Sequence, residues 1–188
     1  MQIIKVKILL FSVLCLIACK NSSDNSSHAD TITSNKASSS NAAATNETDG
    51  LVTAYLQLKN ALAADDGQGA ANAADDLIKN VNTVHLSSAN DSDKVNFQEI
   101  TDDMKEMAEH ISKNPKKIEH QREHFSMLSD DMDDLLNKKK PGKTLYKVFC
   151  PMYNDNKGAY WYSETKEIRN PYLGKKMPGC GNVVKEIK

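Results

Sequence analysis

Apolar residues at helical spacing constrain the fold of this chain more than any other feature. They recur every three or four residues in four successive segments between Leu51 and Leu136, which places them on one face of a helix in each segment. The segments are separated by Asp65-Asp66-Gly67, by the polar residues 85–93 and by Asn114-Pro115, and the last one stops at Pro141-Gly142. Such residues end helices. The pattern predicts an up-down-up-down four-helix bundle over residues 50–140.

The helical period is lost after Gly142. Short runs rich in aromatic or β-branched residues follow at 145–150, 159–163 and 182–187, and such runs are typical of strands. We therefore expect a mainly α fold with a small β-containing appendage, residues 141–188, packed on the bundle in the same domain. The appendage holds most of the aromatic residues, including the only tryptophan, Trp161.

The first 19 residues follow the plan of a secretory signal. Two lysines precede an apolar run from Ile8 to Ile17, and a small residue stands just before Cys19. The run is too short to span a membrane. Its ending L-I-A-C resembles the lipobox of bacterial lipoproteins, in which cleavage leaves the cysteine as the lipidated N-terminus. We expect lipidation of Cys19 and anchoring in the bacterial cell envelope; the alternative is an ordinary signal peptide with an accidental cysteine.

Residues 20–49 consist largely of Ser, Asn, Ala and Thr without apolar periodicity. Such a segment cannot bury enough apolar surface to offset the entropy of ordering, so we interpret it as a disordered tether. Once the signal is removed and Cys19 carries lipid, Cys150 and Cys180 are the only remaining thiols. In an exported compartment such a pair indicates a disulfide, a metal site or both.

Charge and motifs exclude several classes of function. Residues 141–188 carry a net charge of +5 and the rest of the chain −6, but neither part has the basic stripe with interleaved aromatics that binds nucleic acid. The positive appendage also argues against a carboxylate cage for calcium or magnesium. No Ser-His-Asp set, phosphate-binding glycine loop or C-x-x-C pair is visible. We expect no enzyme activity and no small-molecule substrate.

Two short motifs place sulfur atoms in the appendage. F-C-P-M presents Cys150 and Met152, which would point to the same side of an extended strand. M-P-G-C presents Met177 and Cys180 around Pro-Gly, which predicts a type II turn. Thiol and thioether ligands select Cu(I), and can also accept Ag(I) or zinc. The motifs predict a metal site made of these four residues.

Other roles for the sulfur atoms remain open at this point. Cys150 and Cys180 could form a structural disulfide, and Met152 and Met177 could fill gaps in the core. Four further methionines fall within the predicted helices, where a core position is the commoner role: Met104, Met107, Met127 and Met132. Trp161 could cover a Cu(I) site through its ring face, although packing is its commoner use.

The segment H-Q-R-E-H, residues 120–124, matches the H-x-x-E-H signature of a class of zinc peptidases. That chemistry needs a third protein ligand and a substrate cleft, and the chain after His124 is too short to complete the peptidase fold. We expect no third ligand for this motif and interpret His120 and His124 as a solvated helix face without catalytic zinc; the alternative is an adventitious metal site. His85 and His110 are expected at the surface or at loop ends.

Longer stretches resemble a known family. L-Y-K-V-F-C-P-M-Y-N-D-N-K-G-A-Y-W-Y-S, then E-I-R-N-P-Y-L-G-K-K-M, with A-Y-L-Q-L-K-N-A-L and I-E-H-Q-R-E-H-F-S-M-L-S upstream, look like the bacterial domain of unknown function 3347. That family occurs in lipoproteins and beside CusB-like adaptors of copper and silver efflux pumps. The resemblance implies a helical, non-catalytic, heavy-metal-binding domain with sulfur ligands at Cys150, Met152, Met177 and Cys180. Two departures are Phe149, where many relatives have histidine, and the Pro-Gly inside the last turn.

We therefore predict a lipid-anchored envelope protein that binds Cu(I) for copper or silver buffering, or for hand-over to a CusB-like efflux adaptor. The alternative is a non-catalytic envelope interaction module braced by a Cys150–Cys180 disulfide.

Overall fold

The computed structural model describes residues 48–85 and 90–188, all within one compact unit, Asn41–Lys188. The predicted signal peptide, Cys19 and residues 20–47 of the predicted tether lie outside the described residues. The predicted tether end at residue 49 is wrong, because Thr48 is buried and Asp49 begins the first helix. Within the described part, no helix has both the length and the apolar character needed to cross a membrane.

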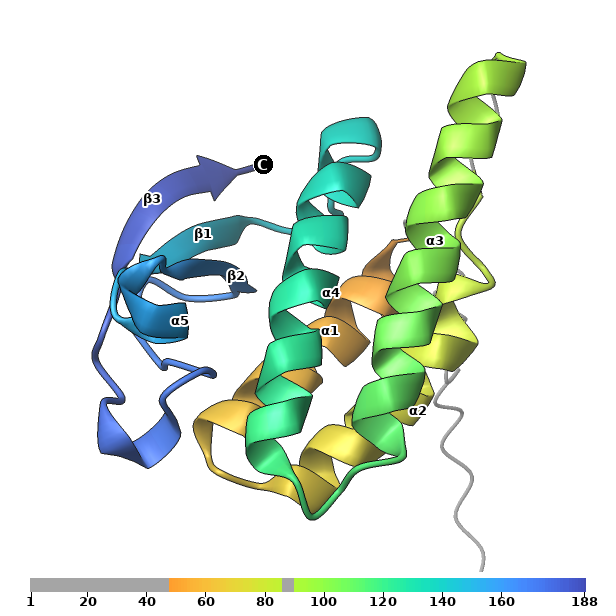
Figure 1. Cartoon of the computed structure of the whole chain (residues 1–188). Helices are drawn as coiled ribbons and strands as arrows, with labels where there is room; N and C mark the ends of the chain where they lie inside the picture. The colour runs from red at the N-terminus through yellow and green to blue at the C-terminus, as the bar shows by residue number, and fades with distance from the viewer. Residues whose placement is uncertain (1–47, 86–89) are drawn as a thin grey trace, which may run out of the picture. The chain divides into compact units, whose positions relative to one another are not determined.

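Four long helices make up most of the described chain (Figure 1). They are α1 (Asp49–Ala63), α2 (Gly67–Val81), α3 (Asp91–Ser112) and α4 (Ile118–Lys138). Each helix packs on the next one in sequence, as short connections require of antiparallel neighbours. The predicted mainly α fold with four helices is confirmed.

Local sequence signals fix the helix ends. The Asp66 side chain accepts a hydrogen bond from the Gly69 N–H and caps α2, and Asn90 caps α3 by accepting from the Asp93 N–H, both at 2.8 Å. Each cap satisfies a backbone donor that the first turn leaves without a partner. Asn114-Pro115 separates α3 from α4, so the end of α3 and the start of α4 lie in one tight hairpin.

The appendage forms a three-stranded antiparallel sheet with strand order β2-β1-β3. Strands β1 (Leu145–Cys150), β2 (Ala159–Ser163) and β3 (Asn182–Ile187) have the predicted bounds. Two short elements were not predicted, α5 (Tyr153–Asn156) and the 3-10 turn η1 (Gly174–Lys176). In α5, Asn154, Asp155 and Asn156 all have positive φ, a conformation that Asn and Asp tolerate better than most residues.

The sheet packs against α1 and α4 through aromatic side chains. Tyr55 of α1 stacks on Phe125 of α4, with ring centroids 5.2 Å apart, and Tyr162 of β2 meets Tyr55 edge-on at 6.4 Å. The Tyr55 hydroxyl is 2.8 Å from the Ser129 hydroxyl and accepts from the Tyr162 N–H at 3.2 Å. Trp161 is fully buried and lies edge-on to Tyr172, so its role is packing.

Arg122 of α4 joins three parts of the chain. Its guanidinium, only 5% exposed, donates to the carbonyl oxygens of Leu62 and Pro171 at 3.0 and 2.8 Å and to the Asp65 carboxylate at 2.5 Å. These partners belong to the end of α1, to the loop after β2 and to the α1–α2 turn. Arg122 therefore fastens the appendage to the bundle.

The four helical methionines divide between core and surface. Met104 and Met132 are fully buried and Met107 is partly buried, but Met127 is 43% exposed. The predicted core position of Met127 is wrong, because two residues after the buried Phe125 a helix has turned by about 200°.

Candidate metal centres

Strand pairing brings the two thiols of the appendage together. Cys150 is the last residue of β1 and is fully buried, and Cys180 stands just before β3. Because β1 and β3 are antiparallel neighbours, the end of one meets the start of the other. The two Sγ atoms lie 3.1 Å apart, and neither is in a disulfide.

M-P-G-C does form a turn, although of another type than expected. The Cys180 N–H donates to the Met177 carbonyl at 3.1 Å, which is the hydrogen bond of a four-residue turn. Gly179 lacks the positive φ that a type II turn requires at this position, so the predicted turn type is wrong. The next residue, Gly181, has the positive φ instead, and a Cβ there would lie 2.8 Å from the Trp161 ring.

Asn170 holds this turn in place. It is fully buried, its backbone N–H donates to the Pro178 carbonyl at 2.9 Å, and its side-chain amide donates to the Cys180 carbonyl at 2.6 Å. Its side-chain oxygen accepts from the N–H groups of Tyr172 and Leu173. Sequence reasoning missed this residue. The only signal was its place before a proline in N-P-Y, which marks a turn.

Met152 is placed differently from the prediction. β1 ends at Cys150, and Met152 follows Pro151 in a turn with φ −91° and ψ −13°. The expected same-side projection from an extended strand is therefore wrong, because proline ended the strand. The backbone N–H of Met152 instead acts on Cys180, where it favours the thiolate and lowers the pKa. Met152 and Met177 are 51% and 44% exposed, which excludes core packing for both.

The environment of Cys180 favours its protonated form. The pKa of Cys180 is raised, chiefly by burial and next by contact with the Cys150 thiol, while the N–H of Met152 opposes the shift. A soft cation would displace the protons, since metal binding requires deprotonated sulfur.

The distance between the two sulfur atoms matches neither a disulfide bond nor a pair of thiolates on one zinc ion. A disulfide bond is about 2.05 Å long, and two thiolates on one tetrahedral zinc ion are about 3.8 Å apart, given Zn–S bonds of about 2.3 Å. The 3.1 Å separation lies between these values. Small side-chain rotations reach either state, so both roles for the pair are geometrically open.

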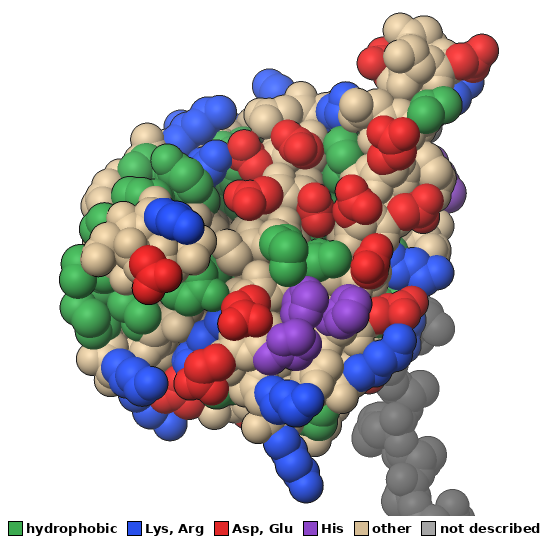
Figure 2. All heavy atoms as spheres, viewed as in Figure 1, with side chains coloured by type: hydrophobic (Ala, Val, Ile, Leu, Met, Phe, Trp, Pro, Cys, Tyr) green, Lys and Arg blue, Asp and Glu red, His purple; other side chains and the backbone are tan. Residues whose placement is uncertain are grey.

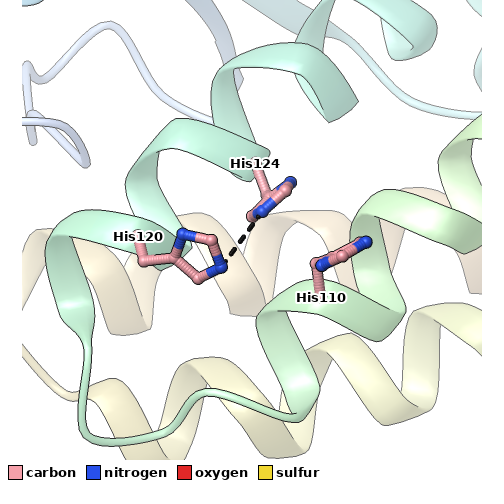
Figure 3. Close-up of side chains that lie close together, drawn as sticks. All are labelled: His110, His120 and His124. Carbon is pink, nitrogen blue, oxygen red and sulfur yellow. Dashed lines mark hydrogen bonds between the residues drawn. The ribbon is translucent and has the colours of Figure 1, made fainter.

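A second group of ligands comes from the helices. His110 lies in the last turn of α3, and His120 and His124 lie one turn apart on α4. One ligand atom from each of the three lies within 4.8 Å of the others (Figure 3). The expectation that H-Q-R-E-H has no third ligand is wrong. The signal that could have found His110 was the predicted hairpin at Asn114-Pro115, which folds the end of α3 back beside the start of α4.

The three imidazoles make close, directional contacts. The Nε2 atoms of His120 and His124 are 3.2 Å apart, and His124 Nδ1 is 3.4 Å from the Met107 sulfur. The rings of His110 and His124 are stacked with centroids 4.4 Å apart. The histidines form one surface patch, bordered by acidic and basic side chains (Figure 2).

Burial and neighbouring charges both act on His124. The pKa of His124 is lowered, chiefly by burial and then by the nearby His110 and His120. Carboxylates approach the other two rings: Glu123 Oε2 is 3.5 Å from His120 Nδ1, and Glu106 Oε1 is 3.9 Å from His110 Nε2. A neutral, ligating imidazole is therefore favoured at His124.

A pocket of about 260 Å³ lies where α4 meets the sulfur-bearing segments. It is lined by Glu119, Arg122, Glu123, Tyr153, Tyr172, Leu173 and Lys176. Tyr153 and Lys176 directly adjoin Met152 and Met177 in sequence. One sequence neighbour of each exposed methionine therefore lines this pocket, while the two methionines themselves do not.

The profile of one protein family matches residues 51–144, and its description is a protein of unknown function, DUF3347. The chain belongs to this family. The DUF3347 match covers the four helices and the three clustered histidines and ends before Cys150. It confirms the family resemblance, whereas the lipoprotein and efflux-adaptor associations remain predictions. Neither the curated proteins nor the solved structures contain a match to the chain.

Proposed function

We propose that this protein is a lipid-anchored protein of the bacterial cell envelope that binds a soft monovalent ion, Cu(I), at Cys150 and Cys180. The observation that carries the proposal is the 3.1 Å approach of the two sulfur atoms, which come from segments 30 residues apart. Two thiolates with thioether neighbours form a donor set that prefers Cu(I) and Ag(I) to hard cations. Zinc is a weaker candidate because a structural zinc site takes four Cys, His or carboxylate ligands, and this set supplies only two thiolates.

The exposure of Met152 and Met177 supports a role in transfer. A side chain of methionine is apolar, and packing is its usual use, but both of these are about half exposed beside the thiols. Thioethers bind Cu(I) without losing a proton, so they can take the ion first and pass it to the buried Cys150. The same route in reverse allows hand-over to a CusB-like efflux adaptor or simple buffering.

A second function is favoured by the same sulfur distance. If the two thiols are oxidised, the disulfide closes a 30-residue loop that contains β2 and η1. In the chain-entropy account such a loop stabilises the fold by about 3–4 kcal/mol. The domain would then be a braced interaction module of the envelope without metal.

Metal loading as a function of thiol redox state separates the two functions. The reduced full chain is titrated anaerobically against a chromophoric Cu(I) chelator, and we expect one Cu(I) per chain. The C150S/C180S chain should not compete for the ion, and disulfide formation should block binding until a reductant is added. Competition that is equal for the parent and the double variant would refute a sulfur site. A disulfide in protein isolated from the envelope, resistant to mild reductant, would favour the braced module.

A further inference from the structure

The histidine group on α3 and α4 is separate from the sulfur site and was unexpected from the sequence. His110, His120 and His124 use side chains from two helices, and each has an outer contact in addition to its neighbours in the group. Surface histidines that gather by chance need not have such contacts. The outer contacts determine which ring nitrogen carries the proton.

For His124 the outer contact is the Met107 sulfur, 3.4 Å from Nδ1. A thioether sulfur can only accept a hydrogen bond, so the contact favours a proton on Nδ1 and a lone pair on Nε2. For His120 the Glu123 carboxylate is 3.5 Å from Nδ1. Its negative charge likewise favours a proton on Nδ1 and a lone pair on Nε2.

With both protons on Nδ1, the Nε2 lone pairs of His120 and His124 face each other, and the two nitrogen atoms are 3.2 Å apart. Two lone pairs at that distance repel, so something positive must lie between them: a proton donated by one ring, or a cation shared by both. Two imidazoles bound to one tetrahedral ion with metal–nitrogen bonds of about 2.0–2.1 Å have nitrogen atoms about 3.3–3.4 Å apart. The observed distance is close to that value.

His110 supplies the third donor. All three ligand atoms lie within 4.8 Å of one another, so closing the group around an ion shortens the longest separation by at most about 1.5 Å. The side chain of His110 is 47% exposed and that of His120 is 37% exposed. Rotation of the His110 ring is therefore sterically open, and solvent can fill a fourth position.

We propose that His110, His120 and His124 form a site for one divalent cation of borderline softness, Zn(II) or Cu(II), with a solvent molecule as fourth ligand. Imidazole suits these ions. The domain would then bind two ions at separate sites, Cu(I) at the sulfur pair and a divalent ion at the histidines. The inference does not rest on the proposed sulfur function, because the ligands are different residues on different elements.

The test uses the full chain with C150S/C180S in every arm, so that the sulfur site is absent. Zn(II) is titrated into the metal-free chain by calorimetry, and Cu(II) is added for electron paramagnetic resonance. We expect one Zn(II) per chain and a Cu(II) spectrum with coupling to three nitrogen nuclei. If C150S/C180S does not fold, C150A/C180A replaces it, because alanine places no hydroxyl group at the buried position 150.

His110→Ala is the decisive variant, since His120 and His124 alone are an ordinary pair one turn apart. We expect at least a tenfold weaker Zn(II) affinity and loss of one nitrogen coupling. H120A/H124A should abolish stoichiometric binding, whereas His85→Ala, which removes an exposed histidine outside the group, should leave it unchanged. Circular dichroism confirms folding of each variant. Unchanged affinity in His110→Ala, or binding that survives H120A/H124A, would overturn the three-histidine site.

Discussion

At the scale of single residues, the two cysteines and two methionines of the appendage are not equivalent. Cys150 is fully buried and Cys180 partly so, whereas Met152 and Met177 are about half exposed. A thiolate is also the stronger donor, because it carries the charge that a thioether lacks. The affinity for Cu(I) should therefore depend mainly on the cysteines.

We expect Cys150→Ser or Cys180→Ser to weaken Cu(I) binding by at least a hundredfold, and Met152→Leu or Met177→Leu by about tenfold or less. Leucine keeps the apolar volume while removing the sulfur. Anaerobic chelator competition measures each affinity. H120A/H124A serves as the control, since it removes two donors outside the sulfur site and should leave Cu(I) affinity nearly unchanged. Equal losses in cysteine and methionine variants would contradict the division of roles.

Asn170 is a positioning residue for the same site. In the parent, the Asn170 amide donates to the Cys180 carbonyl at 2.6 Å. Asn170→Asp replaces this donor with a carboxylate, which faces the same carbonyl. A buried acceptor without a donor costs about 1–3 kcal/mol, so we expect a lower melting temperature and weaker Cu(I) binding. Asn182→Asp makes the same charge change at an exposed position of β3 and should be neutral. An unchanged Cu(I) affinity in Asn170→Asp would show that the site does not need the hydrogen bond from Asn170.

At the scale of elements, α3 and α4 place carboxylates close together. Asp131 on α4 is partly buried, and its pKa is raised to about 7, chiefly by burial and next by Asp103 on α3, with Asp130 and Asp134 adding to the shift. An unfolded aspartate titrates near 3.9. Between these values the folded state binds more protons than the unfolded state, so the contribution of Asp131 to stability falls as pH rises from about 4 to about 7.

Asp131→Asn should remove that decline. We expect the variant to be more stable than the parent at pH 8 by about 1 kcal/mol, a discounted figure because solvent screens a partly exposed carboxylate. At pH 4 the two should be nearly equal. Urea unfolding at both pH values gives the comparison, with Asp75→Asn, an exposed aspartate on α2, as the matched control. A gain that is the same at pH 4 and pH 8 would exclude titration as its cause.

The junction of bundle and appendage depends on Arg122. Arg122→Met would leave the Asp65 carboxylate and the carbonyls of Leu62 and Pro171 without their donor. Breaking a buried, hydrogen-bonded pair of this kind costs about 3 kcal/mol. Chemical denaturation should show that loss, whereas Arg169→Met, at an arginine that is 65% exposed, should change stability by less than about 0.5 kcal/mol. Similar small effects at both positions would mean that Arg122 does not fasten the appendage.

At the scale of the whole molecule, the expected membrane location of the protein depends on Cys19, which lies outside the described residues. L-I-A-C followed by a polar tether predicts lipidation there. We expect the parent to fractionate with membranes and Cys19→Ala to be released or mislocalised, while Cys15→Ala, a change within the signal, should behave like the parent. Fractionation followed by metabolic lipid labelling tests this. A Cys19→Ala chain that remains membrane-bound and labelled would refute the lipoprotein assignment.

The sequence by itself determined the four long helices and the three strands of this protein, but not the short elements α5 and η1. Helical periodicity between Leu51 and Leu136, and the turn residues that interrupt it, located all four helices, and the aromatic and β-branched runs located the three strands. These signals succeed because they are local: side-chain period, caps and breakers act within a few residues. The four sulfur residues were also visible, because their motifs are contiguous.

Only the tertiary structure decided which side chains meet. His110 joins His120 and His124 because the α3–α4 hairpin places the end of one helix beside the start of the other. Asn170 and Arg122 act on partners 10 to 60 residues away, and no local pattern encodes such distances. The turn at Met177–Cys180 took its form from Asn170 and from the close approach of Gly181 to Trp161, instead of the φ preference of Pro-Gly. Packing selects among locally allowed conformations, so the proposed metal sites of the chain depend on contacts that the linear order of residues does not specify.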